Sequence, residues 1–359
     1  MHRSVVWFRR DLSLDDNLAW ADATHSSHEV VPLFVLDERL LAPAGVARHD
    51  ALIGAINALD HHLRECGGAL TVVRGDPVVE VARVAREHDA ASVFWNADVT
   101  RYAQARDRAV EEALDALGIT VHTEWSTHVQ PPGAVTTRAG TAPKVFTRFY
   151  ERWTELELPQ PAPVGEATVL AGTCDALPRL SGGDAAAPGT AAATLDEFLA
   201  RVDAYDDTRD ELDQDATSRL SVHLRFGAIS PRVVVRAVGR RTAARRAFVR
   251  QLAWRDWYAH LFWERPDLVD HAMQEPFEAI AWRNDPDDIE GWKSGHTGVP
   301  IVDAAMRELG ATGWMPNRAR MIVASFLVKD LLVDWRIGER HFRHLLADGD
   351  VPQNAGNWQ

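Results

Sequence analysis

The first third of the chain alternates short runs of β-branched and aromatic residues with amphipathic helical stretches, and this rhythm constrains the fold more than any other feature. The runs predict strands at 4–8, 30–36, 70–73, 92–95 and 120–125. The stretches predict helices that include 51–65, 77–88 and 103–117. A βαβα order predicts an α/β domain with a doubly wound parallel sheet and helices on both faces.

Such a sheet binds its ligand beyond the carboxyl ends of the strands, here near residues 34–37 and 96–98. No G-x-G-x-x-G follows the first strand, so the sequence does not support a dinucleotide site of that type in this half.

Composition excludes several other classes of protein. The 359 residues are 46% hydrophobic and 25% charged, which is typical of a globular protein of about two domains. Only two cysteines occur, so neither a disulfide scaffold nor a cysteine zinc site is available, and no metal is expected. The opening apolar run is too short for a signal peptide and no membrane span follows, which predicts a soluble, cytoplasmic protein.

Three regions are predicted along the chain. Residues 1–128 form the α/β domain, 129–193 a connector and 194–359 an all-α domain. Residues 156–193 are rich in Pro, Ala and Gly, as expected for a connector. In the last region a capping box at Thr194–Glu197 and the pair Ser230-Pro231 predict helix starts. Helical periodicity then covers 243–264, 301–309, 318–333 and 338–346.

The net charge of −13 disfavours general nucleic-acid binding, but residues 219–255 carry ten arginines and no Asp or Glu. This stretch is either a solvated basic helix face or a nucleic-acid contact. Tryptophan is also concentrated: eight of the 13 lie in the last third. The turn Thr217–Ser221 holds three hydroxyls and Arg219, which suits either a helix cap or a pyrophosphate site.

Seven further segments, taken with this turn, identify the family that the chain resembles. They are VWFRRDL (6–12) with Asp16-Asn17, QLAWRD (251–256), GVPIVDAAMR (298–307), GWMPNRARM (313–321), LLVDWR (331–336), DGD (348–350), and Asn354 leading to Trp358-Gln359. In this order and spacing they resemble the photolyase/cryptochrome family over the whole chain. The chain is most similar to a class I DNA photolyase, the carbon–carbon lyase that acts on cyclobutane pyrimidine dimers.

The resemblance implies a folded FAD in the helical domain. The residues that it assigns to the flavin site are Tyr205, Thr217, Ser218, Arg219, Leu220, Ser221, Gln251, Arg255, Asn317, Arg320, Asp348, Gly349, Asp350 and Asn354. Asn354 would face flavin N5, where an amide can hydrogen-bond a protonated N5. Plant-type cryptochromes carry Asp at that place, so Asn354 favours repair over signalling.

The reaction that the resemblance implies is light-driven electron transfer from excited, reduced FAD to a dimer flipped out of UV-damaged DNA. Trp254 would stack on the lesion and Met321 would lie under it, with Gln251 and Asn354 as further catalytic residues. The residues assigned to DNA contact are Arg209, Trp254, Arg255, Arg318 and Met321.

Two departures bear on the lesion. The (6-4) photolyases carry His at the places of Asn317 and Met321, so a cyclobutane dimer is preferred here. Gln251 replaces the Glu that is usual in cyclobutane-dimer enzymes, so a lower repair yield is expected.

The family also implies electron relays and an antenna. Trp282, Trp335 and Trp358 align with the tryptophan relay that photoreduces FAD. An antenna chromophore of deazaflavin or flavin type, rather than folate, is expected near Phe34, Asp37, Asp98 and Tyr102. The protein is expected to act on DNA as a monomer.

Family members continue well past Gln359, so a C-terminally incomplete flavin site is expected. Two alternatives to repair therefore stay open: a cryptochrome-type blue-light photoreceptor, and an inactive truncated photolyase.

Overall fold

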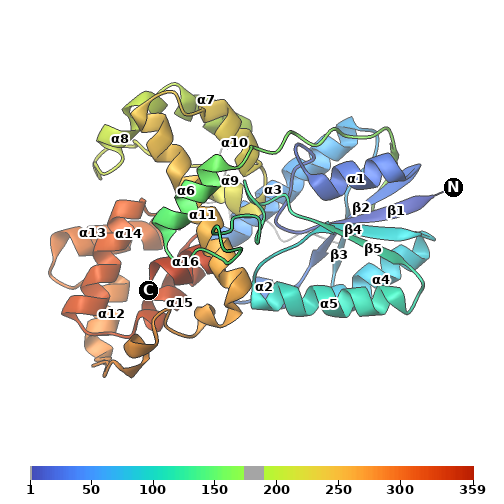
Figure 1. The fold of residues 1–359 in the computed structure, drawn as a ribbon. Coiled ribbons are helices and arrows are strands. Elements are labelled where there is room, and N and C mark those ends of the chain that lie inside the picture. Colours follow the sequence, from blue (N-terminus) through green and yellow to red (C-terminus); the bar gives the residue numbers. More distant parts are fainter. Residues whose placement is uncertain (1, 174–189) are drawn as a thin grey trace.

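The computed structural model describes residues 2–173 and 190–359. A sheet with helices on both faces forms one half of the molecule, and helices form the other half beside it (Figure 1). The predicted fold class, an α/β domain followed by an all-α domain, is confirmed. The division at residues 128 and 193 stays a prediction.

All strand pairs of the sheet are parallel, in the order β3-β2-β1-β4-β5 with β6 beside β2. The bounds are β1 Arg3–Phe8, β2 Glu29–Leu36, β3 Thr71–Arg74, β4 Ser92–Asn96, β5 Thr120–Glu124 and β6 Thr168–Val169. The first five confirm the predicted strands. Strands β1, β2 and β4 are almost wholly buried, as expected for a parallel sheet covered on both faces.

Each face of the sheet is covered by its own pair of helices (Figure 1). α1 (Leu18–Ser26) and α3 (Val46–Glu65) bury Trp20, Ile56 and their neighbours against one face. α4 (Pro77–Glu87) and α5 (Arg101–Asp115) bury valines and leucines against the other. The short α2 (Glu38–Leu41) follows β2. The carboxyl ends of the strands therefore lie at one edge of a three-layer domain, facing the helical half.

The predicted connector contains two elements that the sequence did not reveal. α6 (Phe146–Glu155) buries one aromatic face against α11 (Ala243–Glu264). β6 adds to the sheet through the register Glu29↔Thr168 and Val30↔Val169. A strand of two residues is too short to show an alternating pattern. Part of the predicted connector, 174–189, lies outside the described residues.

The remaining helices build the other half. Their bounds are α7 Ala191–Leu199, η1 Val202–Ala204, α8 Tyr205–Thr208, α9 Ser221–Phe226, α10 Pro231–Val238, η2 Pro266–Val269, η3 Glu275–Ala279, α12 Pro286–Ser294, α13 Pro300–Thr312, α14 Asn317–Ser325, η4 Phe326–Asp330, α15 Trp335–Leu345 and α16 Val351–Asn357. The predicted cap at Ser230 is confirmed, because its side chain accepts from Arg232 N.

Two predicted helix limits were wrong. α7 begins at Ala191 and its N-cap is Thr190, whose hydroxyl accepts from Ala193 N, so Thr194 lies inside the helix. The predicted helix over 318–333 stops at Asp330, after a π-helical turn, because Leu332 adopts a left-handed conformation with φ 53°.

Buried carboxylates join the two halves. Asp16, in the loop after β1, accepts from Arg232 Nε (2.8 Å) and Ser230 Oγ (2.6 Å) at the start of α10. Asp256, in α11, accepts from the backbone of Val129 and Gln130. In the described parts of the chain, no helix combines the length and the apolar character that crossing a membrane requires.

Candidate functional site

The helical half contains a cavity of about 590 Å³, here called the helical-side cavity. It lies between the segment from α8 to α9, the helix α11, the start of α14 and the start of α16. Most residues predicted for the flavin and the DNA line it: Tyr205, Arg209, Thr217, Ser218, Arg219, Ser221, Gln251, Trp254, Arg255, Asn317, Arg318, Arg320, Met321, Asp348 and Asp350. Its volume is within the range of ligand pockets.

A smaller cavity of about 90 Å³ adjoins it and is lined by Asn354, Gly349 and Trp358. The two cavities share several lining residues, among them Asn317, Arg320, Met321, Asp348 and Asp350. The structure therefore brings Asn354 next to the space that Ser218 and Trp254 border, although these three residues do not line one cavity.

Three predicted residues lie elsewhere. Leu220 is fully buried in the apolar cluster around Phe198 and Phe248 and lines neither cavity. Its side chain anchors the turn to the core, and the assignment of Leu220 to the flavin turn stays a prediction. Trp282 and Trp335 also line neither cavity.

The turn 217–221 exposes polar groups to the helical-side cavity through an unusual backbone conformation. Arg219 adopts a left-handed φ of 55°, and Ser218 Oγ accepts from Leu220 N (3.3 Å). The Arg219 guanidinium stacks over Trp314 with 3.6 Å between its carbon and the ring centroid. The turn thus contacts the loop before α14 across the cavity.

Within the described parts of the chain, three buried polar atoms of residues that line the cavity have no hydrogen-bond partner: Thr217 Oγ1, Arg225 Nη1 and Asp348 Oδ1. Buried polar groups in folded proteins are nearly always paired. A hydroxyl, a guanidinium and a carboxylate without partners around one cavity therefore indicate a ligand with both donors and acceptors. FAD, with phosphates, ribityl hydroxyls and ring amides, fits this donor set and the size of the space.

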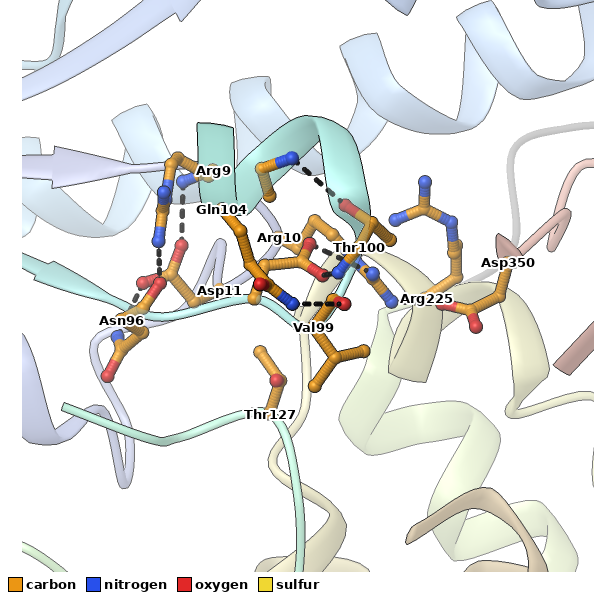
Figure 2. Close-up of polar contacts among 12 residues, drawn as sticks. Arg9, Arg10, Asp11, Asn96, Val99, Thr100, Gln104, Thr127, Arg225 and Asp350 are labelled. Carbon is orange, nitrogen blue, oxygen red and sulfur yellow. Dashed lines mark hydrogen bonds and ion pairs between the residues drawn. The ribbon is translucent and has the colours of Figure 1, made fainter. Parts of the chain in front are cut away.

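Charges are concentrated at the loop that leads into α16 (Figure 2). Arg10 pairs with Asp350, and Arg225 Nε donates to Gly349 O (2.8 Å). Burial raises the pKa of the Asp350 carboxyl. The positive charges of Arg10, and then of Arg225 and Arg255, outweigh this effect, so the pKa of Asp350 lies below its usual value. Burial, with repulsion from Arg10, lowers the pKa of Arg225 to about 9, so it remains charged at neutral pH.

Asn354 is held by a residue that sequence reasoning missed. Its Nδ2 donates to both the backbone oxygen (2.9 Å) and Oε1 (3.0 Å) of Glu339, in α15. Glu339 is 2% exposed, and burial raises the pKa of its carboxyl. Because both bonds use Nδ2, they fix the orientation of the amide and leave Oδ1 as the acceptor. In the sequence, the only signal that could have indicated Glu339 is the i, i+4 spacing of its carboxylate from Arg343.

Trp254 stacks on Phe146 of α6, with 3.6 Å between ring centroids and 11° between the planes, and also borders the helical-side cavity. Met321 lines the same cavity and is 54% exposed. An aromatic surface with one supported face and a thioether beside an open cavity suit the stacking of a base.

The arginines of 219–255 do not form one solvated stripe. Arg232 is buried against Asp16, Arg245 pairs with Asp203 and Arg225 lines the cavity. At the cavity mouth, Arg318 pairs with Asp210 (2.5 Å) and Arg209 lies near Asp206 (3.5 Å). Part of the basic run thus belongs to structural ion pairs and to the cavity, whereas Arg240, Arg241, Arg246 and Arg250 are exposed.

The three tryptophans of the predicted relay belong to one apolar cluster. Trp335 and Trp358 are buried in it and Trp282 packs against its edge. Trp358 contacts Phe342 (5.1 Å between centroids) and Trp292 (6.1 Å).

A second cavity of about 590 Å³, the sheet-side cavity, lies at the carboxyl ends of the strands. All four predicted antenna residues line it: Phe34, Asp37, Asp98 and Tyr102. So do residues that were not predicted, namely Trp7, Arg9, Arg10, Arg106 and Arg225. The guanidiniums of Arg9 and Arg106 each lie over Trp7, with 4.8 Å between the guanidinium carbon and the ring centroid.

Comparisons with known proteins agree with this arrangement. The family model described as DNA photolyase matches residues 4–166, and that of the FAD binding domain of DNA photolyase matches 248–359. The deoxyribodipyrimidine photo-lyase of Streptomyces griseus is 42% identical over 100% of this chain and 82% of its own length.

Two solved structures are similar. A bacterial class III photolyase from Agrobacterium tumefaciens has a TM-score of 0.91 at 33% identity, covering 100% of this chain and 79% of its own. An archaeal photolyase from Sulfolobus tokodaii, solved with two FAD molecules, has a TM-score of 0.88 at 31% identity, covering 99% and 82%. The chain therefore belongs to the DNA photolyase family, and residues 248–359 of its helical half match that family's FAD-binding domain.

Proposed function

We propose that this protein is a light-driven DNA repair enzyme that splits cyclobutane pyrimidine dimers with FAD held in the helical-side cavity. One observation carries the proposal. Thr217, Arg225 and Asp348, whose buried polar atoms have no partner among the described residues, line a space that Trp254 also borders and that adjoins Asn354. The same pocket thus offers a polar cofactor site and an aromatic surface for a base. The names of the relatives support the same reaction.

Bound, reduced FAD would supply the light-excited electron that opens the cyclobutane ring and would regain it afterwards. The protein's part is to bind and orient. The hydroxyls of Thr217, Ser218 and Ser221 and the cation of Arg225 would hold the phosphates and sugars. Glu339 fixes the Asn354 amide so that its Oδ1 can accept a hydrogen bond from the N–H of a reduced flavin ring.

Trp254 and Met321 would receive the lesion after it leaves the helix. Base stacking on an aromatic side chain contributes about 1–3 kcal/mol. A damaged pair costs less to open than a normal one, so flipping adds selectivity. Asn317 and Met321 offer no imidazole acid, which supports the cyclobutane dimer over the (6-4) product. Arg209, Arg255 and Arg318 would contact the phosphates around it.

The test is repair of a thymine dimer in a defined oligonucleotide by the FAD-bound protein, under blue light and in darkness. We expect repair in light only. Trp254→Ala should keep FAD and lose most of the affinity for damaged DNA. Trp263→Ala is the matched control, because Trp263 is 41% exposed and lies outside the cavity. Bound flavin without repair would favour a cryptochrome-type photoreceptor, and a colourless protein an inactive member. Sedimentation of the complex tests whether a monomer binds the DNA.

We also propose that the sheet-side cavity binds an antenna chromophore of flavin or deazaflavin type. Its wall combines the aromatic rings of Trp7 and Tyr102 with six arginines against three aspartates, which suits a planar, anionic ring system. The second FAD of the Sulfolobus tokodaii photolyase shows that a relative can hold two flavins. Equilibrium dialysis against FMN and against a reduced folate distinguishes the two classes. Preference for folate would overturn this assignment.

A further inference from the structure

The side chain of Arg10 joins the two halves at the point where α16 begins (Figure 2). It leaves the loop after β1, and its guanidinium contacts two carboxylates. Nη1 donates to Asp98 Oδ2 (3.0 Å), in the loop between β4 and α5. Nη2 donates to Asp350 Oδ2. One planar group thus links the wall of the sheet-side cavity to a residue of the helical-side cavity.

Asp350 has a second task. It is the N-cap of α16, and its Oδ1 accepts from Gln353 N (3.1 Å) while its backbone oxygen accepts from Asn354 N (2.8 Å). The carboxylate is therefore shared: one oxygen caps the helix and the other is held by Arg10. Since α16 has only seven residues, its first turn determines the placement of most of it.

The helix that starts here carries Asn354, a residue proposed for the flavin site, and its C-cap is Trp358, a residue of the predicted electron relay. Farther along α16, two residues hold the helix against α11. Gln353 Nε2 donates to Arg255 O (2.8 Å), and Gly356 packs so closely on Tyr258 that a Cβ would lie 2.3 Å from the ring. The pairing with Arg10 is what holds its first turn to the sheet half.

We propose that Arg10 is a positioning residue of the flavin site, which acts through Asp350 on the start of α16 and so on Asn354. Arg10 does not line the helical-side cavity, so it acts without touching the cofactor. The inference rests on the proposed function for its catalytic meaning, but the linkage from Arg10 to α16 is a property of the chain alone.

Loss of Arg10 would release Asp350 toward other cations. Arg225 and Arg255 both attract this carboxylate, and Arg225 Nη1 has no hydrogen-bond partner in residues 2–173 and 190–359. A carboxylate that turns toward them would leave Gln353 N without its acceptor. The first turn of α16 should then open more often, as helices do when they lose an N-cap.

The experiment compares Arg10→Gln with Arg10→Lys and with the control Arg3→Gln. Arg3 is the first residue of β1, the strand that precedes the loop of Arg10, and it pairs with Glu29 (2.6 Å) at the opposite end of the strand from Arg10. Amide hydrogen exchange is followed at Asn354 and Trp358 in the protein without FAD, DNA or light. We expect exchange about tenfold faster in Arg10→Gln, as for a lost cap. Arg10→Lys should restore part of the protection, because an ammonium keeps the charge but not the planar fork. Arg3→Gln should match the wild type.

A double-mutant cycle tests the route. Asp350→Asn should accelerate the same amides, and adding Arg10→Gln to it should have no further effect. With FAD bound, Arg10→Gln should also give a more negative flavin midpoint potential. The variant removes the positive charge that neutralises the Asp350 carboxylate, so the flavin site becomes more negative. Wild-type exchange in Arg10→Gln, or additive effects in the cycle, would overturn the inference. Failure to bind FAD would instead count against the proposed function, since the exchange experiments do not need it.

Discussion

The sheet-side and helical-side cavities have the same volume, about 590 Å³, but their lining residues differ in which polar atoms have hydrogen-bond partners within the protein. On the sheet side, Arg9 and Arg106 both bond to Asp107, and the Tyr102 hydroxyl bonds to Asp37. Among the described residues, both walls contain buried polar atoms without a partner: Arg10 Nε on the sheet side, Thr217 Oγ1 and Asp348 Oδ1 on the helical side, and Arg225 Nη1 on both. The unpartnered atoms on the sheet side are guanidinium donors, which suit an anionic ligand, whereas the helical side also leaves a hydroxyl and a carboxylate, which require a ligand with donors as well as acceptors. Arg225 lines both.

The tryptophans offer the sharpest way to break this comparison. Trp282→Phe should slow photoreduction of bound FAD by more than an order of magnitude, because the relay would lose its outer donor. Trp7→Phe should leave the rate unchanged, since two guanidiniums beside Trp7 disfavour a radical cation there. Flavin absorbance under blue light with a thiol reductant gives both rates. A slow Trp7→Phe protein with a normal Trp282→Phe protein would reverse the assignment.

Buried carboxylates give the next largest effect. Burial raises the pKa of both Asp98 and Asp256, but at Asp98 the Arg10 guanidinium outweighs it and the pKa falls. At Asp256 burial prevails over the bonds from Gln130 N and Trp153 Nε1, and the pKa rises from 3.8 to about 6.

The folded state therefore binds the Asp256 proton more tightly than the unfolded state. Its contribution to stability is full below pH 3.8 and is lost as the pH rises through about 6. Relative to Asp256→Asn, the wild type should lose on the order of 3 kcal/mol of unfolding free energy over this window. Urea unfolding at pH 4, 5, 6 and 7 measures the difference. A constant difference would show that Asp256 does not titrate there.

The positions of the strands along the chain and the family could be predicted because they follow from local patterns: buried β-branched runs, and motifs whose spacing is specific to a family. The flavin residues stay a prediction, which the lining of the helical-side cavity supports. What the sequence could not give is long-range pairing. The polar contact between Glu339 and Asn354 joins two helices, and β6 is defined only by its neighbour β2. The polar turn 217–221 likewise gave no sign that the side chain of Leu220 enters the core.

A ligand for the sheet-side cavity sharpens the comparison further. Arg106→Gln removes a cation that faces this cavity and should weaken FMN binding about tenfold, the effect of one charged hydrogen bond. FAD binding in the helical half should not change. Parallel titrations of the two flavins test this, and equal weakening of both would indicate that the cavities are not independent.

The smallest effect is expected at Gln251. Its Nε2 donates to Ala247 O (3.3 Å) within its own helix, so the cavity receives an amide in place of an acid. Gln251→Glu should raise the yield of dimer repair per absorbed photon modestly, because a carboxyl can stabilise or protonate the dimer radical anion. An unchanged or lower yield would contradict the role assigned to this position.

The central claim is that FAD binds in the helical-side cavity, and the amount of flavin bound to purified variants tests it most directly. Three purified proteins are compared: the wild type, Ser218→Trp, which fills the helical-side cavity, and Ala105→Trp, which lies at the exposed rim of the sheet-side cavity. We predict FAD bound in equal amount by the wild type and Ala105→Trp, and none by a folded Ser218→Trp. FAD retained by Ser218→Trp, or lost from Ala105→Trp alone, would contradict the account.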